Sequence, residues 1–152
     1  MISPFHLAIS VRDLASTRQF YGELLQCQEG RSTAHWIDWD FFGHQISTHL
    51  SEAPQETVEN SAVDGCEVPI PHFGAILPWE EWLNLKQRLE TQTVMPQFSF
   101  LIVPQIRYEG QVGEQGTMFF LDPSGNALEF KSFQDPAELF EFHTKDSHAF
   151  EA

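Results

Sequence analysis

Apolar and polar side chains alternate in two short segments of the chain, residues 6–11 and residues 72–77. Because successive side chains of a strand point to opposite faces, both segments are predicted to be strands with one bulky apolar face. A histidine opens each strand on the opposite face, at His6 and at His72. The two segments are therefore interpreted as the first strands of a weak internal repeat.

An amphipathic segment follows each of these two strands. Asp13 is predicted to cap a helix that ends near Leu24. A second helix is predicted to begin after Pro78, with two glutamates in its first turn and its apolar residues on one face. Both helices are therefore expected to cover one face of a sheet.

Three strand-like segments are predicted after each helix. Those after the first helix cover residues 30–34, 36–42 and 44–50, and those after the second cover residues 97–108, 117–121 and 127–133. Residues 122–126 (DPSGN) are typical of a tight turn between the last two strands. Each half of the chain is thus predicted to have the order βαβββ.

The halves are modules at residues 4–52 and 69–133, with an acidic linker at 53–68 and a tail at 134–152 that is predicted to form a short docking helix. A module of about 55 residues is too small to bury both its helix face and its sheet face alone. We therefore predict one α+β domain over residues 1–152. Its two paired βαβββ modules form a cup-shaped, barrel-like mixed sheet with the helices outside.

The charge balance excludes several classes of partner. The chain has 8 lysines and arginines against 22 aspartates and glutamates, a net charge of −14. Such a surface repels nucleic-acid phosphates and anionic membranes, and no apolar run approaches the roughly 20 residues of a membrane helix. Two cysteines form neither a disulfide framework nor a zinc-site spacing, and no secretory signal is evident. We expect a small-molecule substrate and a cytoplasmic location.

Strand parity indicates candidate metal ligands. His6, His72 and Glu129 are each predicted to lie on the strand face that carries a small residue and not the bulky apolar ones. Two neutral imidazoles and one carboxylate form a facial donor set that leaves coordination positions open for substrate, water or dioxygen. This set suits Fe(II), Mn(II), Co(II), Ni(II) or Zn(II). The alternative is that each residue is an ordinary hydrogen-bonded or surface side chain.

The strand at residues 44–50 adds further candidates. Its parity predicts that Gln45, Ser47 and His49 point inward. His49 would serve as a further ligand, as a general acid or base, or as a hydrogen-bond partner of a substrate or of its strand neighbours. His44 falls on the helix-facing side, although a slip of one residue would exchange it with Gln45.

The segments PFHLAISVRDLASTRQFYGELLQC, PHFGAILPWEEW and GTMFFLDPSGNALEFKSF resemble the signatures of the vicinal oxygen chelate superfamily. That superfamily contains glyoxalase I, extradiol ring-cleavage dioxygenases, methylmalonyl-CoA epimerase, fosfomycin-resistance enzymes and bleomycin-resistance proteins. The resemblance covers residues 4–133. It implies paired βαβββ modules, one divalent ion held by His6, His72 and Glu129, and a possible homodimer.

A His, His, Glu ligand set is similar to that of the extradiol dioxygenases, which favours Fe(II) and a catechol-like substrate. The resemblance implies a catalytic residue at His44 or Gln45 and proton transfer by His49 or His44. Phe119 stands where those enzymes have a tyrosine. The predicted substrate contacts are Ser47, Arg107, Tyr108, Phe119 and Lys131.

Two other functions stay open. A glyoxalase-like lyase or isomerase would stabilise an enediolate at the ion, with His49 or a bound water moving the proton. Those enzymes usually have a glutamate ligand on the strand that corresponds to residues 45–50, where this chain has no glutamate. A bleomycin-resistance-like protein would bind a flat or chelating molecule without turnover. The sequence therefore predicts a metal-dependent enzyme, dioxygenase-like first, lyase-like or isomerase-like second, with the pure binder as a third alternative.

Overall fold

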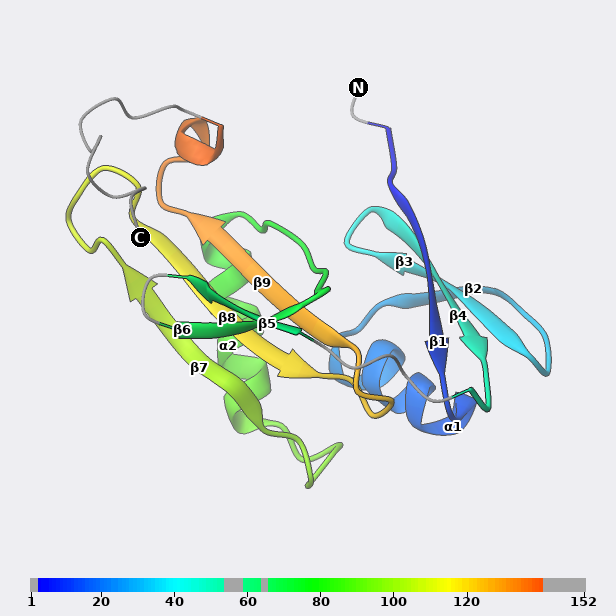
Figure 1. The fold of residues 1–152 in the computed structure, drawn as a ribbon. Coiled ribbons are helices and arrows are strands. Elements are labelled where there is room, and N and C mark those ends of the chain that lie inside the picture. The colour runs from blue at the N-terminus through cyan, green and yellow to red at the C-terminus, as the bar shows by residue number, and fades with distance from the viewer. Residues whose placement is uncertain (1–2, 54–58, 64–65, 141–152) are drawn as a thin grey trace.

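The computed structural model describes residues 3–53, 59–63 and 66–140, which form two modules side by side (Figure 1). The first module contains β1 (His6–Val11), α1 (Leu14–Thr17), η1 (Arg18–Leu24), β2 (Gln28–Ser32), β3 (Trp36–Phe41) and β4 (His44–Leu50). The second contains α2 (Trp79–Thr91), β7 (Phe100–Arg107), β8 (Gln115–Leu121) and β9 (Ala127–Phe133), followed by the short helix η2 (Pro136–Leu139). The predicted α+β class and its paired modules are confirmed, but the strands form separate sheets and not one barrel-like sheet.

The first sheet has the strand order β1-β4-β3-β2, with β1 parallel to β4 and the other pairs antiparallel. The predicted helix start is confirmed, since the Asp13 side chain accepts a hydrogen bond from the Ser16 amide at 2.6 Å. The chain continues from α1 into the π-helical turns of η1. There Tyr21 stacks on Trp39 of β3 with ring centroids 5.8 Å apart, so this helix covers one face of the sheet.

The second sheet has the order β7-β8-β9, and the segment at residues 73–77 runs parallel to β9 along its free edge. The Glu129 amide donates to the Phe73 carbonyl at 2.8 Å, and the Leu77 amide donates to the Lys131 carbonyl at 2.8 Å. Gly74 permits this close approach, because a Cβ there would overlap the backbone carbonyl of Glu129. The segment predicted to be a strand at residues 72–77 therefore pairs with β9 as a fourth strand would.

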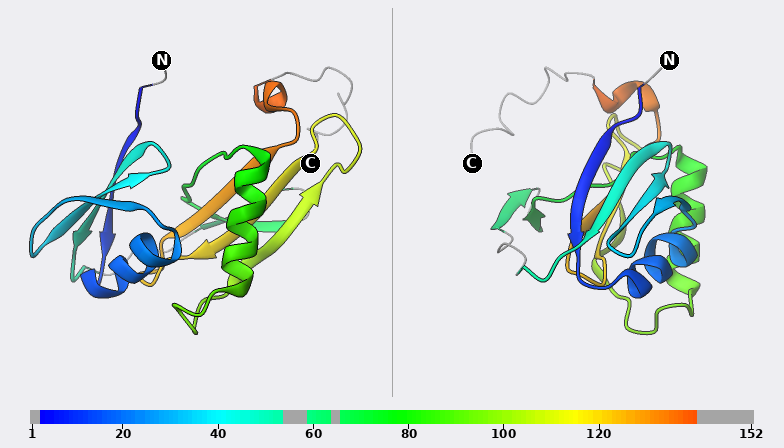
Figure 2. Two further views of the ribbon diagram at one scale, coloured as in Figure 1. Left: turned by 180° about the vertical axis from the view of Figure 1, so that it is seen from behind. Right: turned by 90° about the vertical axis from the view of Figure 1, so that its right-hand side faces the viewer.

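The segment interpreted as a linker contains a hairpin that the sequence pattern did not predict. Its strands are β5 (Glu59–Val63) and β6 (Cys66–Ile70), paired antiparallel. The hairpin lies on the side of the second sheet opposite α2 (Figure 2). The predicted tail helix is present as η2, and residues 141–152 of the tail lie outside the described residues.

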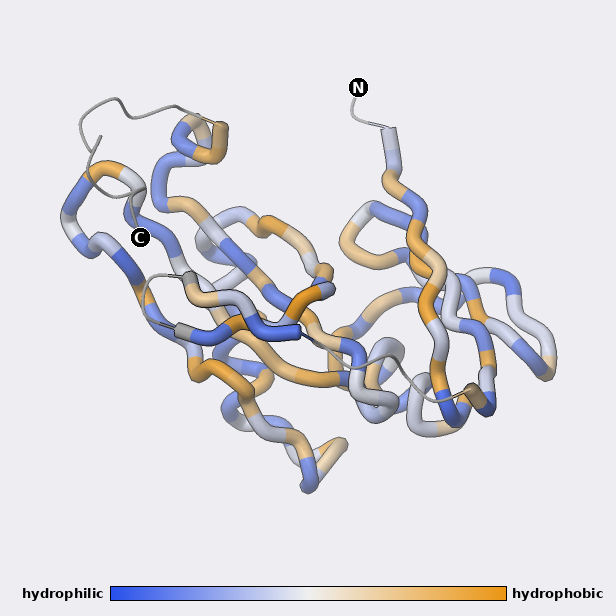
Figure 3. The backbone as a smooth tube through the Cα atoms, in the orientation of Figure 1, coloured by the Kyte–Doolittle hydropathy of each residue, from blue (hydrophilic) through white to orange (hydrophobic). Residues whose placement is uncertain are grey.

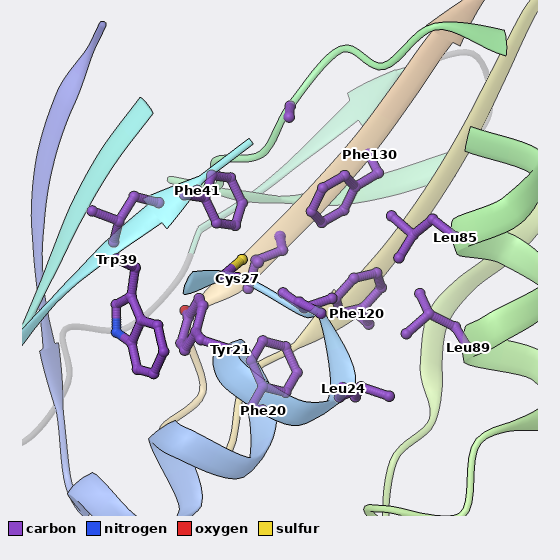
Figure 4. Close-up of a cluster of buried hydrophobic side chains, with 14 of the residues drawn as sticks. Phe20, Tyr21, Leu24, Cys27, Trp39, Phe41, Leu85, Leu89, Phe120 and Phe130 are labelled. Carbon is purple, nitrogen blue, oxygen red and sulfur yellow. The ribbon is translucent and has the colours of Figure 1, made fainter. Parts of the chain in front are cut away.

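One apolar core joins the two modules. Phe20 of η1 lies 6.0 Å from Phe120 of β8, and Phe41 of β3 lies 5.8 Å from Phe130 of β9, measured between ring centroids (Figure 4). Apolar positions along β1 are interrupted by hydrophilic ones (Figure 3), and Leu7 is one that packs against this core. The opposite faces carry His6 and Gln45 in the first module, and Glu129 with Phe119 in the second.

Hydrogen bonds fix the same junction. The buried Tyr21 hydroxyl donates to an Asp122 carboxylate oxygen at 3.0 Å, and burial raises the pKa of Tyr21 well above its usual value, so the hydroxyl keeps its proton. The Asn126 side chain donates to the Ser10 carbonyl at 2.9 Å. These contacts hold the end of β1 against the β8–β9 turn, so the modules have a fixed relative position.

Across the described ranges, no helix is long and apolar enough to cross a membrane.

Gly74→Ala tests the close approach of residues 73–77 to β9. We expect this substitution to lower the free energy of unfolding by about 3 kcal/mol, because the new methyl group must push the two backbones apart. Gly22→Ala is the matched control, since its Cβ would lie 3.4 Å from the Trp39 ring, an ordinary contact. Denaturant unfolding of both variants measures the difference, and equal stability of the two would contradict the packing described.

Candidate functional site

Two of the predicted ligands meet at the edge of the second sheet. His72 directly precedes the segment that pairs with β9, and Glu129 lies on β9 itself. The His72 Nε2 atom is 3.1 Å from the Glu129 Oε2 atom, and the side chains are 23% and 10% exposed. Backbone pairing therefore brings a histidine and a glutamate together across 57 positions of the sequence, counted from 72 to 129.

The Glu129 carboxylate has a different neighbour at each oxygen. The Thr117 hydroxyl donates to Oε1 at 2.7 Å, whereas the Lys131 ammonium nitrogen lies 3.6 Å from Oε2. Thr117 and Lys131 face each other in the β8–β9 register. Phe119 is buried, and its ring meets the His72 imidazole edge to face at 5.1 Å. The predicted contacts Phe119 and Lys131 thus lie beside the His72–Glu129 pair.

The tautomer of His72 follows from the contact of its second ring nitrogen, Nδ1. Nδ1 lies 2.6 Å from the Pro69 carbonyl oxygen, which can only accept, so Nδ1 carries the proton. In the neutral ring the lone pair of Nε2 then faces the carboxylate oxygen of Glu129. Two lone pairs at 3.1 Å repel each other unless a proton or a cation lies between them. A carbonyl bound to the second ring nitrogen is also the usual partner of a metal-ligating histidine.

His6 has the same pattern on the first sheet. Its Nδ1 atom lies 2.8 Å from the Gln45 Oε1 atom, so its Nε2 lone pair is also directed away from the protein partner. Of the described residues, however, no three histidine, cysteine, aspartate or glutamate side chains lie close enough to share an ion. One chain therefore brings together His72 and Glu129 but not His6.

The register of β4 shows which neighbour shares the face of His6. His6 pairs with Gln45, and their side chains are in contact. His44 lies on the other face, where it lines an apolar pocket of about 150 Å³ with Phe41 and Phe73 among others. Its Nδ1 atom accepts a hydrogen bond from the Phe5 amide at 2.9 Å. The geometry thus associates Gln45, and not His44, with the candidate ligand.

Ser47 and His49 lie on the polar face of the first sheet, with partners that sequence reasoning missed. The Ser47 hydroxyl donates to the buried Asp38 carboxylate, and His49 lies beside Trp36 with ring centroids 6.4 Å apart. Arg31 pairs with Asp38 at 3.2 Å and covers the Trp36 ring. The alternation of residues 36–41 against 44–50 was the signal that would have identified these partners.

Arg107 and Tyr108, two predicted substrate contacts, lie at the end of β7. Strand β8 separates β7 from β9 in the sheet. In the β7–β8 register Arg107 faces Gln115, two positions along β8 from Thr117, so one strand lies between it and β9.

Comparison with known proteins agrees with the fold. Residues 3–130 match the sequence-family model described as the glyoxalase/bleomycin resistance protein/dioxygenase superfamily. A search of curated proteins finds no match. A protein from Alicyclobacillus acidocaldarius, described as a glyoxalase/bleomycin resistance protein/dioxygenase, is 32% identical, with 91% of this chain and 96% of that chain covered and a TM-score of 0.71.

Two more distant structures share the fold. The fosfomycin resistance protein FosX from Listeria monocytogenes is 19% identical over 91% of this chain and 98% of its own, with a TM-score of 0.63. The virulence protein STM3117 from Salmonella typhimurium is 19% identical over 88% of this chain and 98% of its own, with a TM-score of 0.57.

Histidine tautomers test the geometry without any added ion. In long-range nitrogen–proton NMR spectra at pH 8, we expect His6 and His72 to carry their proton on Nδ1, because each Nδ1 faces a carbonyl oxygen. His44 is the internal control and should carry its proton on Nε2, since its Nδ1 accepts from Phe5. An unprotonated Nδ1 in His72 would contradict its contact with the Pro69 carbonyl oxygen.

Proposed function

Because the chain belongs to the glyoxalase/bleomycin resistance protein/dioxygenase superfamily, we propose that it is a metal-dependent enzyme acting on a small, oxygen-chelating substrate. One observation carries this proposal: the Nε2 lone pair of His72 and a carboxylate oxygen of Glu129 converge at 3.1 Å. A carbonyl oxygen at Nδ1 fixes the ring in the tautomer that a metal ligand needs.

The residues at this point fit a divalent ion. Imidazole nitrogen and carboxylate oxygen together suit Fe(II), Mn(II), Co(II), Ni(II) or Zn(II), among which we favour Fe(II) by resemblance only. Glu129 is oriented by Thr117, and His72 by the Pro69 carbonyl, as the outer partners of metal ligands commonly are. When bound, such an ion would supply Lewis-acid chemistry to two substrate oxygens, and Fe(II) would add reactivity with dioxygen.

We assign the third ligand to His6 of a second copy of the chain. Within one chain, the shared core and the hydrogen bonds from Tyr21 and Asn126 oppose any movement of the modules that would bring His6 to His72. Among the described residues, no strand pairs with the outer edge of β1, and Phe5 beside it is 62% exposed, so this edge offers a surface to another copy. The proposed enzyme is therefore a homodimer whose two chains share each site.

Other side chains of the chain would then orient the ligands, transfer a proton and contact the substrate. Gln45 orients His6 by accepting the hydrogen bond from the His6 Nδ1 atom, and Thr117 orients Glu129. His49 is exposed on the same face as His6 and would transfer a proton to or from the substrate. Ser47, held by Asp38, lies between these two histidines along β4 and β1 and would contact substrate oxygens.

The geometry supports a lyase-like or isomerase-like reaction better than ring cleavage. Phe119, which is buried against His72, offers no hydroxyl group to a substrate, and His44 is turned into the apolar pocket on the opposite face. Proton transfer by His49 at a chelated substrate needs neither of those groups. Anaerobic loading with Fe(II), followed by catechol and oxygen, separates the two, because only ring cleavage consumes dioxygen.

A metal-free binding protein is the second candidate. The Glu129 carboxylate already has the Thr117 hydroxyl and the Lys131 ammonium group beside it, so its charge is compensated without an ion. Metal content after purification without a chelator distinguishes this candidate from the enzyme.

Mixing two variants tests the shared site. His6→Ala and His72→Ala homodimers should each lose the ion, since every site in them lacks one ligand. A purified heterodimer of the two should regain about half of the wild-type metal content, because it contains one intact site and one that lacks both histidines. Elemental analysis of tagged heterodimers measures this recovery.

The control variant is His35→Ala, which removes an exposed histidine outside the strands and should leave metal content unchanged. Metal retained by His72→Ala would overturn the proposed ligand set. Heterodimers that stay empty, while the wild type binds metal, would show that each site is built within one chain.

A further inference from the structure

We propose that Lys131 is a built-in counter-ion of Glu129 that competes with a metal ion and, once displaced, pairs with a negatively charged substrate. This inference rests on the proposed function, and it specifies the substrate class as a small, anionic oxygen chelator. It concerns the charge balance of the site rather than the identity of its ligands.

The position of Lys131 makes this competition direct. Lys131 follows Glu129 by two positions on β9, so both side chains lie on the same face of the strand. Its Nζ atom lies 3.6 Å from Oε2, the same oxygen that faces His72 Nε2 at 3.1 Å. An ion that binds between His72 and Glu129 must therefore enter next to the ammonium group.

The exposures of the two side chains show which one can move. Glu129 is 10% exposed and is fixed at Oε1 by Thr117, whereas Lys131 is 39% exposed. In the part of the chain that the structure describes, Lys131 is the permanently charged partner of Glu129. A divalent ion at Oε2 repels the ammonium group, and the flexible lysine side chain can turn away while the carboxylate stays.

Displacement leaves the ammonium group at the edge of the site. The backbone of Lys131 is fixed, since its amide donates to the Ala75 carbonyl at 3.1 Å and its carbonyl accepts from the Leu77 amide at 2.8 Å. Because the Lys131 backbone does not move, the length of the lysine side chain keeps the displaced ammonium group near Glu129. A divalent ion, one carboxylate and one ammonium group sum to two positive charges, which a doubly negative chelator compensates and a neutral one does not. The site is thus suited to dianionic ligands.

Titration of the full-length protein with Mn(II) tests the first half of this proposal. Lys131→Gln should bind Mn(II) about tenfold more tightly than the wild type, because the competing charge is gone. Lys86→Gln is the matched control, since Lys86 pairs with Glu90 on α2, and it should bind like the wild type. Equal affinity of Lys131→Gln and the wild type would overturn the competition.

Binding of two chelators to the Mn(II)-loaded proteins tests the second half. Lys131→Gln should bind the dianion oxalate about tenfold more weakly than the wild type, and Lys131→Arg should restore binding. Glycolamide, a neutral chelator with two oxygen donors, should bind the wild type and Lys131→Gln within about twofold of each other. Equal losses for oxalate and glycolamide would show a merely structural role and overturn the assignment.

The outcomes separate this inference from the proposed function. If neither the wild type nor Lys131→Gln binds Mn(II) while both remain folded, the metal site itself is wrong, and the inference is overturned with it. If the wild type binds Mn(II) but the lysine variants match it for metal and oxalate, only the role of Lys131 is overturned. Tight Mn(II) binding by Lys131→Gln alone would support the competition.

Discussion

The candidate site depends on the close parallel contact between residues 73–77 and strand β9. This contact requires the missing side chain of Gly74, because the backbone carbonyl of Glu129 occupies the position of its Cβ. It carries His72 to Glu129, where the Pro69 carbonyl and the Thr117 hydroxyl fix the ring and the carboxylate. The chemistry of the pair therefore follows from backbone pairing rather than from a flexible loop.

The packing of the modules determines how much of a site one chain can build. Their helix-facing surfaces share an apolar core, and Tyr21 with Asp122 adds a buried hydrogen bond across the junction. The polar faces consequently have a fixed separation, with His6 and Gln45 on one and His72 and Glu129 on the other. In the proposed enzyme, these two faces are half-sites that a second copy of the chain completes.

Local patterns in the sequence predicted the repeated strands, the Asp13 cap and the faces of Gln45 and His44, because strand parity and capping depend on neighbouring residues. Parity also predicted that Glu129 and His72 would face the same side, and their side chains are in contact. The hairpin β5–β6 was missed because its strands have few large apolar residues. The separation of His6 was missed because contacts between modules leave no periodic signal in either one.

The most direct test of this account is anomalous X-ray diffraction from crystals of the metal-loaded protein. The account predicts one ion per chain, bound by the Nε2 atom of His72 and a carboxylate oxygen of Glu129, with His6 of a second copy as the third protein ligand. Density for the ion at any other place, or an unmoved Lys131 ammonium group on Glu129 in crystals soaked with saturating metal, would contradict it.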